Sequence, residues 1–278
     1  MAINYASTFS PKVDEMFAKQ SFTNGLTNAE YSWTGVETVT VYSVPTVGLN
    51  NYTLTGNSRY GTPAELQNNI QVMKVEDDKS FTFTIDRKSE QDTLSVMSAA
   101  PALAREVEQV VIPYVDTYRF AKMVAGAGNA KYGVTATASN AYSNVLDVQA
   151  MLDEDYAPTA GRVLVVTPAY FNLLKLDESF VKRGDLATGI ALTGQVGEVD
   201  GMPVIKVPST YLPTGTNFII TNAIATVAPV KLTEYKVHID PPGINGALVE
   251  GRIRQDAFVL NNKKNAIGIC MSSAAPTP

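Results

Sequence analysis

Residues 98–126 read SAAPALAREVEQVVIPYVDTYRFAKMVAG, and this stretch decides what the rest of the chain must provide. Apolar side chains recur every three or four residues along it, which predicts an amphipathic α-helix. Ser98 can cap its start, and Gly126 is a typical stop. At about 1.5 Å per residue the helix would run roughly 40 Å, so it needs a sheet or a neighbour along its length. The side chains expected in the core are Leu103, Val107, Val110, Tyr114 and Tyr118.

Pro113 lies in the middle of this helix. Proline lacks a backbone N–H and crowds the preceding turn, so we expect a kink there. The prediction is therefore one long helix with a local irregularity near its centre.

Two alternating segments precede the helix, and both predict β-strands: Glu37–Val44, and Ser80–Asp86 with Phe81, Phe83 and Ile85 on one side. The residues between them are rich in proline, glycine and asparagine, which favours turns and extended backbone. We interpret residues 36–90 as a long two-stranded ribbon that projects from the body. Such a ribbon is marginally stable alone, so removing residues 45–79 should leave a folded chain that has lost only its ability to assemble.

The segments after the helix predict an α+β module and then a β-rich end. Residues 126–140 form a small-residue linker. The elements expected beyond it are a helix at Ala141–Leu152, a strand at Arg162–Val166, a helix at Pro168–Leu176, strands at Val204–Val207 and Phe218–Thr221, and closing β stretches at Tyr235–Ile239, Ala247–Leu260 and Asn265–Met271.

Composition excludes several function classes. The formal net charge is −5 and no basic stripe is present, which disfavours binding along a nucleic-acid backbone. No apolar run is long enough to cross a bilayer, so we expect a protein made in the cytosol that does not contact membranes. His238 lies in an alternating strand and Cys270 in an apolar one, and both suit ordinary structural roles.

No residue pattern for catalysis, cofactor binding or metal binding is apparent. The single histidine has no nucleophile paired with it, and one histidine and one cysteine cannot supply a zinc site. The acidic clusters Glu76–Asp78 and Asp153–Asp155 lack the spacing of a calcium loop, and we interpret them as solvated turns. We therefore expect no enzyme activity, no cofactor and no metal.

The order of the segments resembles a known family, the major capsid proteins of tailed bacteriophages, which have the Hong Kong 97-type fold. Four phrases carry the resemblance, and it covers residues from about 37 to 270. They are the proline-then-aspartate helix Val111–Arg119, the strand and helix Arg162–Tyr170, the glycine turn into a strand Gly197–Val204, and the closing strand Gly251–Phe258.

The resemblance implies an α+β fold with an N-terminal arm, an extended β-hairpin loop, a peripheral domain with a long spine helix, and an axial domain. The implied boundaries are an arm at 1–35, the extended loop and its flanking strands at 36–97, the spine helix and linker at 98–139, the axial domain at 140–234, and return strands with a C-terminal tail at 235–278.

The implied function is that of a coat protein that self-assembles. Pentamers and hexamers would form an icosahedral head, in the virion, that encloses double-stranded DNA without sequence-specific binding. Assembly would take place in the host cytoplasm, with a separate scaffolding protein, a portal and decoration proteins as further partners. Two alternatives stay open: an encapsulin-like bacterial nanocompartment shell that encloses cargo enzymes, and a structural protein of a phage tail or adhesion device.

Assembly needs surfaces that a single copy leaves uncovered, and the arm and the ribbon both carry apolar side chains that suit this role. The residues expected in contacts between subunits are Phe17, Phe22, Trp33, Tyr42, Leu54 and Tyr60. A glycine-rich loop is expected at the ring axis, where five-fold and six-fold rings require slightly different backbones. Its glycines are Gly184, Gly189, Gly194 and Gly197.

Overall fold

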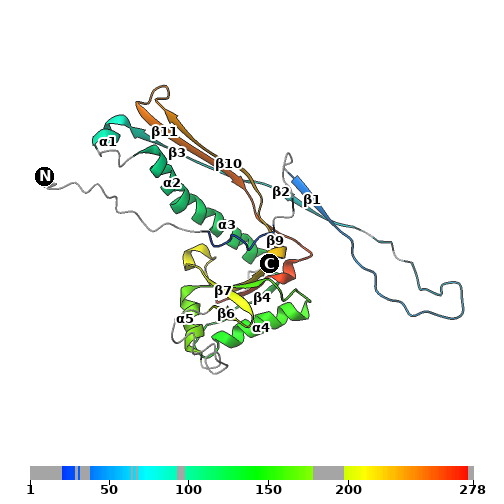
Figure 1. The fold of residues 1–278 in the computed structure, drawn as a ribbon. Coiled ribbons are helices and arrows are strands. Elements are labelled where there is room, and N and C mark those ends of the chain that lie inside the picture. Colours follow the sequence, from blue (N-terminus) through cyan, green and yellow to red (C-terminus); the bar gives the residue numbers. More distant parts are fainter. Residues whose placement is uncertain are drawn as a thin grey trace.

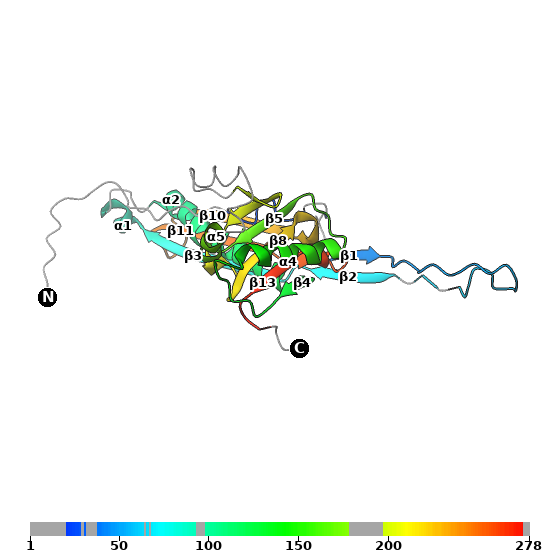
Figure 2. The same ribbon diagram turned by 90° about the horizontal axis from the view of Figure 1, so that it is seen from below.

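A computed structural model describes residues 21–28, 31, 38–63, 65–66, 68–92, 98–177 and 197–274. The molecule has three parts (Figure 1): a plate of strands with a long helix along it, a compact sheet with flanking helices below it, and a thin loop that projects far to one side. In the perpendicular view the loop extends well beyond the rest of the molecule (Figure 2). This elongated shape exposes a large surface area for a chain of this mass.

The plate is a three-stranded antiparallel sheet in the order β10-β11-β3, with β10 at Val230–Ile239, β11 at Gly246–Gln255 and β3 at Asp77–Asp86. Strands alternate their side chains between two faces, and here the apolar ones lie on the face toward the helix. On that face Phe83 is opposite Val249 and Phe81 is opposite Gly251. The other face carries charged pairs such as Arg252 with Asp78.

The spine helix, residues 99–125, consists of three pieces: α2 at Ala99–Glu106, a π-helical turn η1 at Val107–Val111, and α3 at Ile112–Ala125. Pro113 is near the start of α3. Because proline cannot donate to the carbonyl one turn earlier, the regular helical ladder has to change register just before it, and the π turn is where it does so. The predicted irregularity therefore exists, as a widened turn in the preceding five residues.

Gly126 ends the spine helix as predicted, although not in the left-handed conformation that glycine caps often adopt, since its φ is −95°. The reason for glycine at this position is space. A Cβ there would lie 2.6 Å from Cγ2 of Val259. The absence of a side chain thus allows the helix end to approach the segment around Val259.

The projecting loop is built differently from the prediction. β1 (Thr38–Ser43) pairs antiparallel with β2 (Asn69–Lys74), and β3 pairs with β11 instead. The expectation that Ser80–Asp86 forms the second strand of the ribbon is therefore wrong. Beyond the ribbon, residues 44–68, which we call the finger, project away from the body (Figure 2). Removing residues 45–79 would also delete β2 and the fully buried Met73 and Val75.

The compact part is a six-stranded mixed sheet in the order β4-β13-β8-β5-β7-β6. Its strands are β4 (Asn129–Lys131), β13 (Gly268–Met271), β8 (Thr216–Asn222), β5 (Arg162–Val166), β7 (Met202–Lys206) and β6 (Glu198–Val199). Two predictions fail here. Residues 129–131 were assigned to a linker, and 268–271 to the return into the other domain, yet both belong to this sheet.

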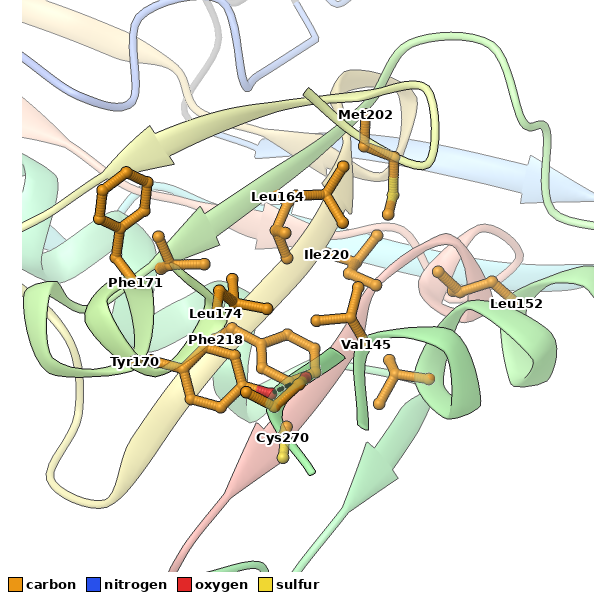
Figure 3. Close-up of a cluster of buried hydrophobic side chains, with 14 residues drawn as sticks. Val145, Leu152, Leu164, Tyr170, Phe171, Leu174, Met202, Phe218, Ile220 and Cys270 are labelled. Atoms are coloured by element: carbon orange, nitrogen blue, oxygen red, sulfur yellow. Dashed lines mark hydrogen bonds between the residues drawn. The ribbon is translucent and has the colours of Figure 1, made fainter. Parts of the chain in front are cut away.

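Both faces of this sheet are buried. One face packs under α4 (Ala141–Glu154) and α5 (Pro168–Leu176), where Leu164, Tyr170 and Phe218 lie in the cluster of Figure 3. The other face packs against α3, because Phe120 and Met123 of that helix are fully buried in a second cluster with Ile219. The spine helix therefore begins along one sheet and ends in the core of the other.

Short elements complete the chain: α1 (Arg87–Asp92), η2 (Ser209–Tyr211), η3 (Ala223–Ala225), β9 (Thr226–Val227), β12 (Phe258–Val259) and η4 (Lys264–Ala266). β9 pairs with β12. In the described part of the chain, no helix combines the length and the apolar character that crossing a bilayer requires.

Candidate assembly interface

The finger is the most exposed part of the described chain. Every described residue between 44 and 68 is exposed except Gly61, which is half-buried. Large apolar side chains are nevertheless frequent on it and on the ribbon, and their exposed fractions reach 103% at Leu49 and 82% at Leu54. A concentration of apolar side chains on a projecting segment indicates a surface that another molecule covers.

The tip of the finger has an ordered local structure of its own. The backbone N–H of Thr53 donates to the carbonyl of Arg59, and the Ser58 hydroxyl donates to the carbonyl of Gly61. The rings of Tyr52 and Tyr60 meet edge to face with centroids 5.1 Å apart. These contacts favour one shape of the tip and reduce the entropy lost on docking.

The predicted contact residues fall into three groups. Tyr42, Leu54 and Tyr60 are 64%, 82% and 83% exposed, so they are available for a partner. Phe22 is covered by its own chain, because it packs edge to face on Tyr211 with ring centroids 5.4 Å apart. Phe22 is thus half-buried in its own chain, and its part in a contact between subunits stays a prediction. Phe17 and Trp33 lie outside the described residues.

Residues 21–28 are fastened to the body, which the prediction of a free arm at 1–35 did not anticipate. The carboxylate of Asp116, fully buried in α3, accepts from the Ser21 hydroxyl at 2.9 Å, the Phe22 N–H at 2.6 Å and the Thr23 hydroxyl at 2.5 Å. Arg119 in turn donates to the Thr23 hydroxyl at 3.0 Å. Burial lowers the pKa of Arg119, and the nearby Asp116 opposes that shift.

The predicted stripe of the spine helix is only partly a core in the single chain. Leu103, Val107, Tyr114 and Tyr118 are half-buried. Val110 is 52% exposed, so its assignment to the core is wrong for one copy taken alone. Val110 lies in the widened turn η1, where Val111 is the buried residue.

Two tyrosines tie the spine helix to the plate by hydrogen bonds. The Tyr114 hydroxyl donates to Asp77 at 2.7 Å, and the Tyr118 hydroxyl donates to Asp256 at 2.8 Å. Burial, followed by the hydrogen bond to the carboxylate, raises the pKa of both phenols well above the ordinary value. Both therefore stay protonated donors at any physiological pH.

An apolar groove of about 190 Å³ lies between the spine helix and the plate. Val110, Tyr114, Phe81 and Ile253 contribute to its lining. On the same face of the plate, but toward its opposite end, Ile239 at the end of edge strand β10 is 79% exposed. This face has the apolar character and the open edge that a projecting segment of another copy could cover.

The predicted ring-axis loop lies mostly outside the described residues, and this includes Gly184, Gly189 and Gly194. Gly197 is described and exposed, directly before β6. Its role at a ring axis stays a prediction.

His238 and Cys270, the two residues considered for catalysis or metal binding, have surroundings typical of structural residues. His238 Nε2 lies 3.3 Å from Glu250 on the polar face of the plate. Burial raises the pKa of the Cys270 thiol, which disfavours a reactive thiolate. Within the described part of the chain, no cluster of three or more potential metal ligands occurs.

The acidic clusters are not the simple solvated turns that we predicted. Asp78, at the start of strand β3, forms a two-point ion pair with Arg252, whose hydrogen bond lowers the pKa of Asp78. Asp153 pairs at 2.7 Å with the almost fully buried Arg162. The first contact joins segments distant in sequence, and the second fixes the end of α4. Both roles are structural.

Sequence reasoning assigned no role to Asp116, whose carboxylate holds residues 21–23, or to Gln71 in β2, whose side chain bonds to the main chain of Val259 and Asn261. A signal existed for Asp116, because a charge between Val115 and Tyr118 interrupts an apolar helix. For Gln71 the signal is weak, since β2 carries apolar residues on both sides and the strand itself was not predicted.

Comparison with known proteins adds to this geometry. No model of a known protein family and no curated protein sequence matches the chain. Solved structures do match. A structure from Mycobacterium phage Che8 superposes with a TM-score of 0.80 at 16% identity, covering 99% of this chain and 100% of the other. The capsid of Cyanophage P-SCSP1u gives 0.77 at 13% identity, covering 96% and 92%.

This chain has the fold of phage capsid proteins. The mature capsid of bacteriophage PhiM1 also matches, with a TM-score of 0.73 at 13% identity and coverage of 96% and 92%. A virus-like particle from Pyrococcus furiosus matches less well, with a TM-score of 0.56 at 10% identity and coverage of 91% and 92%. The coverage of both chains means that the capsid fold includes the plate, the six-stranded sheet and the finger together.

Proposed function

We propose that the chain is the major capsid protein of a tailed bacteriophage. In this proposal it forms pentamers and hexamers that close into an icosahedral head around double-stranded DNA, with the virion as its final location. The observation that carries the proposal is an exposed, apolar finger on a chain whose fold over its whole length is that of phage capsids.

The physical mechanism is completion of one copy by the next. The finger carries exposed Leu49, Leu54 and Tyr60, and the body offers the apolar groove beside Val110. Because donor and acceptor are different surfaces of the same chain, the contact is heterologous, and it gives a finite assembly when rotation closes a ring. Obligate contacts of this kind bury large apolar areas.

The remaining partners follow from the same proposal. With a formal net charge of −5, the chain would contain DNA without binding it tightly, which suits a genome that must be packed and released. We also propose a separate scaffolding protein, a portal and decoration proteins as partners, with assembly in the host cytoplasm. The role is structural and requires no catalytic group.

An encapsulin-like shell around protein cargo is the second candidate, since the virus-like particle from Pyrococcus furiosus has a related fold. The phage structures superpose more closely and at higher coverage, which favours the genome-enclosing role. Particles taken from the cells that produce this chain separate the two: the first proposal expects nuclease-resistant DNA inside them, and the second expects a co-purifying protein.

The finger provides the direct test. Replacing residues 45–67 by an Asn-Gly turn should join β1 to β2 as a short hairpin and leave both cores intact, since none of the described residues in this range is buried. The full-length chain should form closed shells in negative-stain images, and the shortened chain should sediment as free subunits with an unchanged circular dichroism spectrum.

A length-matched variant guards against an effect of the deletion itself. Leu49→Ser, Leu54→Ser and Tyr60→Ser together keep the finger but remove its apolar side chains, and they should also prevent shell formation. Normal shells from the shortened chain would contradict the proposal, as would a full-length chain that remains a monomer under all assembly conditions.

A further inference from the structure

The finger is held by a small core and one side chain at its base. Met73 and Val75 are fully buried with Val227 and Leu260, and this cluster fixes the end of the ribbon nearest the body. Further out, the side chain of Gln71 bonds to the last residue of β12 and to the turn that follows it. Its Nε2 donates to the carbonyl of Val259 at 2.8 Å, and its Oε1 accepts from the N–H of Asn261 at 2.9 Å.

Both the N–H and the oxygen of the Gln71 side-chain amide form hydrogen bonds with main-chain atoms about 190 residues away in the sequence. A donor and an acceptor held together fix the rotation of the ribbon as well as its distance from the body. Glutamate has the same shape but would place a carboxylate oxygen against the Val259 carbonyl, and asparagine is one methylene shorter. Among the described residues from 44 to 68, no hydrogen bond to the body occurs, so Gln71 is the outermost such attachment.

Packing beside Gln71 is partial, because only Val41, its partner across the ribbon, contacts the buried cluster of Met73 and Val75 at this level. A groove of about 470 Å³ separates the ribbon from the turn after β12, with Ser43, Asn69 and Ile70 on one side and Asn261 and Lys263 on the other. Beyond Val41 the ribbon is separated from the body, and the two hydrogen bonds of Gln71 are the outermost polar contacts that fix its angle.

A small rotation at the base becomes a large displacement at the tip. About 12 residues in each direction at about 3.3 Å per residue place the tip roughly 40 Å from the base, so a tilt of about 10° moves it by roughly 7 Å. Apolar contacts require approach within about 4 Å, so such a tilt removes the finger from its docking surface.

We propose that Gln71 is a positioning residue for assembly, whose side-chain amide sets the angle of the finger so that successive copies close into shells of uniform size. This inference rests on the proposed function, because it assumes that the finger makes the contact between subunits. It assigns to one glutamine a role in the geometry of the shell that is separate from the stability of the subunit.

The test compares Gln71→Glu with Asn68→Asp in the full-length chain. Both exchange an amide for a carboxylate and add one negative charge, but Asn68 is exposed and lies at the finger's end of β2. Asn68→Asp should give wild-type shells. Gln71→Glu should lower the yield of closed shells about tenfold and broaden their diameters, because only a fraction of the subunits holds the docking angle. Yield is measured by sedimentation and diameter by negative-stain microscopy.

A second variant removes the bonds without adding charge. Gln71→Met keeps the length of the side chain, and it should also reduce yield and broaden diameters while circular dichroism and the melting temperature of the shortened, non-assembling chain stay unchanged. Wild-type shells from both Gln71 variants would overturn the inference and leave the proposed function intact. Insolubility of both variants would overturn it too, because the clamp would then be a requirement of folding. Absence of shells from the unmodified chain would instead count against the proposed function.

Discussion

Asp116 shows how a single residue can hold two distant parts of the chain together. A carboxylate without exposure to solvent is costly unless donors surround it, and here three donors from residues 21–23 do so. Leu26, a few residues further along the chain, is only 3% exposed and lies in the core that includes Phe120. The contact therefore joins the start of the described chain to the middle of the spine helix.

Replacing Asp116 by alanine should destabilise the subunit by about 3 kcal/mol, because it leaves three donors without an acceptor, among them the fully buried Thr23 hydroxyl. Urea unfolding of the chain with the shortened finger measures this without interference from assembly. Thr117→Ala is the matched control, since Thr117 is the next residue of the same helix and is exposed. Equal unfolding midpoints for the two variants would show that the carboxylate does not hold residues 21–23 in solution.

At the residue scale, sequence alone identifies apolar positions better than polar ones. The periodicity of the spine helix correctly predicts a helix, but it does not show which positions are covered, and Val110 proves to be half-exposed. Polar side chains such as Asp116 gain their roles from partners about 95 residues away. No local pattern specifies such partners, because they depend on the tertiary fold.

Among the elements, the spine helix divides its length between two cores. Its middle lies along the plate through the hydroxyls of Tyr114 and Tyr118, and its end inserts Phe120 and Met123 under the six-stranded sheet. The spine helix therefore fixes the orientation of the plate relative to the six-stranded sheet. The junction is rigid only as long as the end of the helix stays packed.

Phe120→Ala should cost about 3–5 kcal/mol of unfolding free energy, because a fully buried ring is replaced by a cavity. Val110→Ala, in the same helix but 52% exposed, should change it by less than about 0.5 kcal/mol. Urea denaturation of the non-assembling chain gives both values. In the full-length chain Val110→Ala should still reduce shell yield if the groove beside it receives a finger, so equal yields would remove that groove from the proposed contact.

The errors at the element scale concern pairing and not the existence of strands. Arg162–Val166 and Pro168–Leu176 have the predicted bounds, since each is marked by a local apolar pattern. The ribbon was assigned the wrong partner because β2 has apolar residues on both faces and shows no clear alternation. β13 was assigned to the wrong sheet because its neighbours, β4 and β8, are distant in sequence.

For the whole molecule, the order of segments was more informative than any one of them. The resemblance to phage capsid proteins rested on weak local phrases, and the superposition on two phage capsid structures at 13% identity confirms the fold that their order implied. Such low identity suits a chain whose contacts are mostly apolar, because cores tolerate many exchanges that conserve volume. The predicted domain boundaries remain approximate, since β10 runs across the one at 234/235.

A chain completed by its neighbours should have a stability that depends on its own concentration. Assembly binds the folded subunit and not the unfolded one, so raising the protein concentration about a hundredfold should stabilise the full-length chain by up to about 2.7 kcal/mol, or roughly 5 °C in melting temperature. The chain with residues 45–67 replaced should melt at one temperature throughout this range, because it has lost the donor surface. Scanning calorimetry of both chains measures the difference directly. A full-length chain whose melting temperature is independent of concentration would show that the exposed finger and groove contribute no binding free energy, and a shortened chain that keeps the dependence would place the contact elsewhere on the body.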